Sequence, residues 1–203
     1  MNSIMSKCFL VSLLASSSLW LSACGPKAFT KGEYDDVQRE NLLDDKWSET
    51  DMQSSVKELV GSLGGSQPIA NARKKPIVMV TGLQNKTSEE IETQSIMDMI
   101  KVELTNSGRV NFIDREARQD ISDEYEYQNS GMVGDESKKG PGGQIGADFI
   151  LNGRLESITK TIGKDKTVYY KLTLNLTNLK TSVIEWAGQK EMRKLFKKRS
   201  VGL

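Results

Sequence analysis

The sequence predicts an α+β domain: a single domain with a mixed, partly antiparallel sheet flanked by helices. Three observations predict it. A compact apolar run at 77–80 is typical of a buried strand. Apolar residues recur every three or four positions within 52–63 and 96–104, as in amphipathic helices. Apolar and polar residues alternate strictly over 170–177, as in an antiparallel strand with one solvated face.

The first 23 residues have the pattern of a bacterial lipoprotein signal peptide. Lys7 precedes an apolar run that serines dilute and that falls short of the ~20 residues a membrane span needs. Ser22 and Ala23 also suit ordinary signal cleavage, but Leu21 three residues before Cys24 favours a lipoprotein. We therefore expect residues 1–23 to be removed and Cys24 to carry lipid, such as palmitate, as a membrane anchor.

The segment that follows Cys24 is polar and acidic. We expect residues 24–46 to form a flexible tether and residues 47–203 to form the domain. A chain of ~22 residues spans ~75 Å when stretched and ~25 Å as a coil. Gly25, where enterobacterial-type sorting places Asp in retained proteins, favours the outer membrane, with the domain facing the periplasm.

Two helices are expected in the first half of the domain. Thr50 and Gln53 have the spacing of a capping box for a helix that stops at Gly64-Gly65. The buried strand at 77–80 then leads into a loop at 82–87. Thr87 and Glu90 have the same capping-box spacing, before a helix that ends near Ser107-Gly108.

The middle of the chain is less strongly patterned. A second strand is expected around 110–113, followed by a charged helix over 115–128 whose apolar stripe is thin. Residues 129–143 contain five glycines and one proline among them and are expected to form a loop or a frayed helix end. Asp123, Glu124 and Glu126 lie close together in the charged helix expected over 115–128. Adjacent carboxylates on a solvated helix are typical of an exposed surface and not of an acid–base pair.

The last part is expected to be all strand. Residues 148–158 and 170–177 form strands with a turn at 163–165 between them, and a short strand follows at 183–186. The resulting order is β-α-β-α-β-β-β. The chain is then expected to finish in a basic tail that is either a solvated guard of the sheet edge or a contact for an anionic surface; it contains Lys190, Arg193, Lys194, Lys197, Lys198 and Arg199.

Composition excludes several classes of function. The chain has no histidine, Cys8 lies in the signal peptide and Cys24 would be lipidated, so zinc, haem and thiol chemistry lack their usual residues. Removing the signal peptide and its Lys7 leaves 27 basic and 27 acidic residues, a balance that does not favour nucleic acid. The sequence predicts no catalytic site, cofactor or metal, so we expect a protein that is not an enzyme.

An ordered set of segments resembles a known family. These segments are Ile77–Val80, Asn85–Thr87, Asn106–Val110, Ile145–Leu151 and Ile184–Glu191. They span residues 76 to about 194 and follow the lipoprotein cleavage motif, or lipobox, that ends at Cys24. Together they are similar to the LpoB-type penicillin-binding-protein activator lipoproteins. The resemblance implies a fold like the N-terminal domain of TolB. It also implies a partner, because such lipoproteins dock on a class A penicillin-binding protein. They raise its peptidoglycan synthesis and so act in cell wall biogenesis.

An alternative within the same fold is a structural or secretion-assembly envelope lipoprotein, because curli-export lipoproteins resemble it too. The best-known activators also carry a long Pro-rich tether, which this chain lacks. Asn85, Lys86 and Thr87 are candidate partner-binding residues, although Asn85 is equally suited to capping a turn, and Trp186 to filling the core. The sequence leaves the identity of the partner and the oligomeric state open.

Overall fold

The computed structural model describes residues 32, 34–40, 42 and 44–198. The chain divides into two units, Met1–Val37 and Gln38–Leu203, and every described helix and strand belongs to the second. The predicted signal peptide and the predicted lipid attachment at Cys24 lie outside the described residues.

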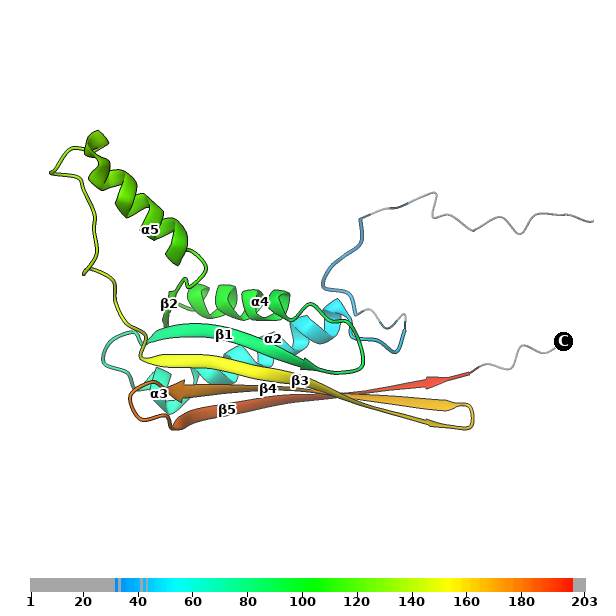
Figure 1. The fold of residues 1–203 in the computed structure, drawn as a ribbon. Coiled ribbons are helices and arrows are strands. Elements are labelled where there is room, and N and C mark those ends of the chain that lie inside the picture. The colour runs from blue at the N-terminus through cyan, green and yellow to red at the C-terminus, as the bar shows by residue number, and fades with distance from the viewer. Residues whose placement is uncertain (1–31, 33, 41, 43, 199–203) are drawn as a thin grey trace, which may run out of the picture. The chain divides into compact units, whose positions relative to one another are not determined.

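The second unit is built on one mixed sheet (Figure 1). Its strands lie in the order β2-β1-β3-β4-β5, with β1 parallel to both β2 and β3, and with β4 antiparallel to both β3 and β5. Their bounds are β1 Ile77–Lys86, β2 Asn111–Ile113, β3 Phe149–Ile162, β4 Asp165–Asn178 and β5 Ile184–Lys197. The predicted fold class is confirmed, including the order β-α-β-α-β-β-β.

Two helices cover one face of the sheet. They are α2 (Glu49–Gly64) and α4 (Thr93–Asn106), with the short α3 (Gln67–Ala70) beside α2. Their apolar stripes pack on the sheet and form the core with residues of β1, β3 and β4. The other face of the sheet carries no helix among the described residues (Figure 1), and it is called the open face below.

Strand β4 shows why the sheet has two different faces. Every second side chain from Val168 to Leu176 is buried against the helices, while the residues between them are half-buried on the open face. The predicted alternation is therefore confirmed. A two-residue turn, in which Gly163 has a φ of 60°, joins β3 to β4.

The last strand differs from the prediction. Residues expected in a basic tail, Lys190 to Lys197, lie instead in β5, which pairs with β4 over its whole length. The alternation was hidden because lysine and methionine, rather than aliphatic residues, occupy the positions that face α2. Strand β1 is also longer than predicted and continues through Gly82, whose φ of 131° lies at a shift in register, to Lys86.

Both expected capping boxes were wrong in position. Helix α2 is capped by Ser48 and Asp51, two residues before the predicted pair. Helix α4 begins at Thr93 with Glu92 as its N-cap. The side chain of Thr87 instead hydrogen-bonds with Asn85 and Glu89 in the loop that precedes α4, so it is not available to start the helix.

A third segment projects from the sheet. Helix α5 (Arg118–Tyr127) and the turn η2 (Gln128–Met132) that follows it contain no buried residue, and Figure 1 shows α5 pointing away from the strands. The residues of the thin apolar stripe predicted for this helix, Ala117, Ile121 and Tyr125, are half-buried and do not join the core.

Candidate docking surface

The open face of the sheet is polar and accessible. Its central residues come from four adjacent strands and are exposed or half-buried. Register partners on neighbouring strands place their side chains on the same face. The set comprises Gln84 and Lys86 of β1, Asn152, Arg154 and Glu156 of β3, Lys171, Thr173 and Asn175 of β4, and Gln189 and Glu191 of β5.

Charges of alternating sign cross this face in one row. Lys86, Glu156, Lys171 and Glu191 are successive register partners on β1, β3, β4 and β5. Glu156 Oε2 lies 3.0 Å from Lys171 Nζ and 3.3 Å from Arg154 Nε. The close approach of the Lys171 ammonium, with a further contribution from Arg154, lowers the pKa of Glu156. Glu156 is therefore held in its ionised form within the row.

A shallow polar hollow adjoins the row. It has a volume of about 480 Å³ and lies where β1 shifts its register against β3. Its polar side chains are Thr81, Gln84, Asn152, Arg154 and Asn175. The amide groups can donate hydrogen bonds to, and accept them from, a peptide backbone or polar side chains, and the guanidinium group can donate them. The face can thus recognise a polar protein surface.

The three residues that the sequence singled out, Asn85, Lys86 and Thr87, lie at one edge of this face. Lys86 is exposed on the face itself. Asn85 Nδ2 donates to Glu89 O at 2.8 Å, and Asn85 Oδ1 accepts from Thr87 N at 3.0 Å. Asn85 and Thr87 therefore hold a turn, and only Lys86 of the three is directed to the open face.

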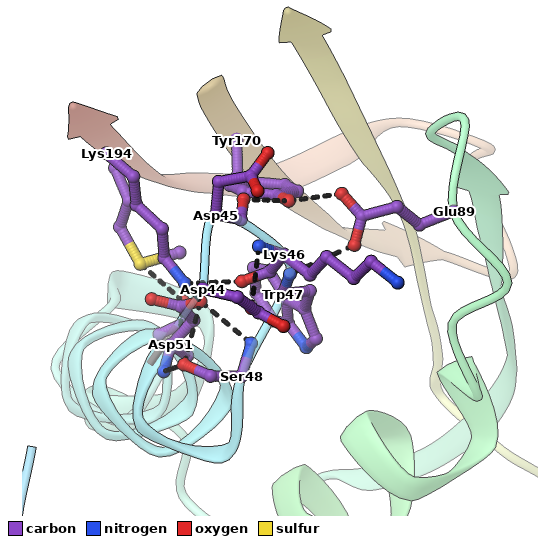
Figure 2. Close-up of polar contacts among 11 residues, drawn as sticks. Asp44, Asp45, Lys46, Trp47, Ser48, Asp51, Glu89, Tyr170 and Lys194 are labelled. Carbon is purple, nitrogen blue, oxygen red and sulfur yellow. Dashed lines mark hydrogen bonds and ion pairs between the residues drawn. The ribbon is translucent and has the colours of Figure 1, made fainter. Parts of the chain in front are cut away.

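On the opposite side, a polar cluster binds the residues before α2 to the sheet (Figure 2). The Tyr170 hydroxyl donates to a carboxylate oxygen of Glu89, and Glu89 Oε2 accepts from Trp47 N at 3.0 Å. The Trp47 ring meets the Tyr170 ring edge-on, with centroids 5.5 Å apart. Burial, and then the bond to Glu89, raises the pKa of Tyr170.

A buried ion pair completes this cluster. Lys194 Nζ lies 2.5 Å from Asp51 Oδ2 and donates to Lys46 O at 2.5 Å. Asp45 also pairs with Lys166, and this hydrogen bond lowers the pKa of Asp45. Residues 45–47, which close the expected tether and open the expected domain, thus make specific contacts with β4 and β5. Sequence reasoning missed Asp51, for which the capping-box spacing of Ser48 and Asp51 was the available signal. It placed Lys194 in the basic tail, and no local pattern marks that residue as buried.

Neither a metal-binding cluster nor a membrane-spanning helix occurs among the described residues. Within them, no three His, Cys, Asp or Glu side chains gather in a way that could hold a metal ion. Nor does any helix in that part of the chain have the length and apolar character to cross a membrane.

The sequence matches the model of one known protein family. The model of a family described as peptidoglycan-synthase activator LpoB matches residues 51–192. No protein of curated function matches the chain.

Similar solved structures include two LpoB C-terminal domains. The domain from Escherichia coli is 16% identical with a TM-score of 0.46, and that from Salmonella enterica is 12% identical with a TM-score of 0.43; each match covers 70% of this chain and 98% of the other. Lipoprotein GNA1162 from Neisseria meningitidis is 12% identical with a TM-score of 0.39, over 62% of this chain and 88% of the other.

Proposed function

The chain belongs to the LpoB family of peptidoglycan-synthase activators, and we propose that it is a non-enzymatic envelope lipoprotein that binds and activates a class A penicillin-binding protein. The observation that carries the proposal is the family match, which covers α2 through most of β5. The open face supports it, because a polar face with fixed charges and no covering helix is available to a protein partner.

The proposal assigns the contact to the charged row and the hollow. Lys86 and Arg154 are exposed at this face and do not contribute to the core. Charges at the rim of an interface set the association rate and the register of the partners. Reversing these charges therefore weakens binding without unfolding the domain.

The experiment combines a pull-down with an enzymatic assay. The mature chain is tested for binding to purified class A penicillin-binding proteins and for its effect on their polymerisation of lipid II. We expect binding and a faster reaction. The Lys86→Glu and Arg154→Glu variants are compared with Lys57→Glu, which changes an exposed lysine on α2, away from the open face.

The possible results separate the activator role from the assigned contact surface. No binding and no rate change with the unaltered chain would refute the proposed activator role. Equal loss in the open-face variants and in Lys57→Glu would refute the assigned surface only. A stable homo-oligomer in native extracts, without synthase binding, would favour the alternative of a structural or secretion-assembly lipoprotein.

We also propose a lipid anchor at the N-terminus of the mature chain. Cys24 carries the lipid, residues 1–23 are removed and the domain faces the periplasm from the outer membrane. The lipobox Leu21–Cys24 and Gly25 support this placement. Cys24→Ala should leave an uncut precursor that takes up no radiolabelled palmitate, and labelling of that variant would contradict the assignment.

A further inference from the structure

Strands β3, β4 and β5 continue beyond the end of β1. Lys86, the last residue of β1, pairs with Glu156, whereas β3 runs on to Ile162 and β5 pairs with β4 as far as Asp165. The result is a three-stranded extension at one end of the sheet (Figure 1). Its open face differs in chemistry from the polar hollow described above.

Four apolar or aromatic residues gather on the open face of this extension. Ile158 and Tyr169 are direct register partners, and Leu195 lies opposite Thr167, diagonal to Tyr169. Ile158, Ile162 and Leu195 are 57%, 78% and 59% exposed. Exposed aliphatic side chains that share one face of a short extension with an aromatic ring are typical of a binding surface. This set, with Tyr169, is called the apolar tip.

Cations surround the apolar tip. Lys160, Arg193 and Lys197 are exposed on the same face, and Lys164 lies in the adjoining turn. The acids on this part of the face are Asp165 and Glu191. Guarding the sheet edge would explain the lysines, but it does not explain the exposed isoleucines and leucine. Aliphatic and tyrosine side chains ringed by Lys and Arg fit the interface of an anionic bilayer.

The residues that precede α2 meet the protein at the same extension. Asp45 pairs with Lys166, whose register partner on β5 is Phe196, and Lys46 O accepts from Lys194. These contacts are on the helix-covered side of strands whose other side forms the apolar tip. Only 20 residues separate Cys24 from Asp45, so a lipid at Cys24 keeps a membrane within reach of this end.

We propose that the apolar tip, formed by Ile158, Ile162, Tyr169 and Leu195 with its surrounding cations, docks on the anionic lipid surface to which the chain is anchored. This inference rests on the proposed lipid anchor, not on activation of a synthase. It gives the domain a fixed orientation, with the extension toward the lipid and the hollow farther along the sheet.

The test uses the lipidated mature chain in vesicles with and without phosphatidylglycerol. Cys24 is the one cysteine after cleavage and is lipidated, so Ile162→Cys supplies a single thiol for an environment-sensitive fluorophore. Met132→Cys, at a 75% exposed position in η2, is the matched control. We expect a blue shift and quenching by brominated lipid at position 162 in anionic vesicles, and neither effect at position 132.

A charge reversal tests whether the cations around the apolar tip are needed for contact with lipid. Lys160→Glu with Arg193→Glu should abolish the signal at position 162 while the anchor still floats the protein with the vesicles. Equal signals at positions 162 and 132, or no signal at either in a protein that floats, would overturn the proposal. So would a shift at position 162 that needs a penicillin-binding protein rather than lipid. Failure to float would instead contradict the anchor at Cys24.

Discussion

Lys194 Nζ lies 2.5 Å from Asp51 Oδ2, in a pair whose side chains are only 4% and 8% exposed. The pair joins the edge strand β5 to the first turn of α2. Lys194 also donates to Lys46 O, and its Nζ lies 5.9 Å from the centroid of the Tyr170 ring. One buried cation thus holds together α2, the segment before it and two strands.

Removing this cation should destabilise the domain strongly. Lys194→Met leaves Asp51 buried without its counterion, a change that costs about 3–5 kcal/mol of unfolding free energy. Lys190→Met is the control, because its partner Glu58 is 56% exposed on the same helix, and exposed pairs contribute about 0–1 kcal/mol. Urea denaturation measures both. Equal losses would contradict a special role for the buried pair.

The stability of the domain should fall in alkali because of Tyr170. Its pKa is raised in the folded state, so the folded protein favours the neutral phenol. This contribution to stability is present below the unfolded pKa of about 10 and is lost as the pH rises above it. Urea midpoints should therefore drop more steeply above about pH 10 in the unaltered chain than in Tyr170→Phe.

A control separates Tyr170 from the other titrating groups. Tyr127→Phe changes a tyrosine that is 53% exposed at the end of α5. This variant should keep the steep alkaline loss. A slope that is the same in Tyr170→Phe as in the unaltered chain would show that ionisation of other groups causes the loss.

A glycine in β3 should be required for strand pairing. A Cβ added at Gly153 would lie 2.1 Å from Thr173 O and 2.8 Å from Leu174 Cδ2, so β3 and β4 would have to separate. We expect Gly153→Ala to cost at least the 1–3 kcal/mol typical of overpacking. Gly146→Ala is the control, since no atom lies within 4 Å of its added Cβ. Thermal unfolding of the two variants tests the difference.

The sequence predicted the elements whose apolar period is unbroken. The stripe of α4 and the alternation of β4 bury the expected side chains, since each follows one geometric repeat. The second half of β5, beyond the short strand expected at 183–186, escaped prediction because its inward positions include Lys190 and Lys194, which pair with acids of α2. A buried cation is recognisable in sequence only when its distant partner is already known.

The candidate surface was harder to predict than the fold. Lys86 was singled out as part of a loop, but its place in a charged row depends on its parallel register with β3, and nothing local in the sequence sets that register. The apolar tip also escaped notice, because Ile158 and Leu195 lie 37 positions apart and meet only through β4.

The turn at the end of β1 separates a structural role from a docking role. Asn85 bonds to Glu89 O and to Thr87 N, and Glu89 in turn holds Tyr170 and Trp47. Asn85→Ala should therefore cost about 0.5–1.5 kcal/mol of stability, from the net loss of these hydrogen bonds at an exposed position. Lys86→Ala should change stability by less than about 0.5 kcal/mol, because the side chain is exposed.

Asn85→Asp should remove only part of the hydrogen bonding at this turn. An aspartate still accepts from Thr87 N but cannot donate to Glu89 O, so its stability should fall between those of the unaltered chain and Asn85→Ala. Urea denaturation of the three variants, with synthase binding measured on the same samples, provides the test. If Asn85→Ala kept full stability and lost binding, Asn85 would contact the partner directly instead of shaping the turn that presents Lys86.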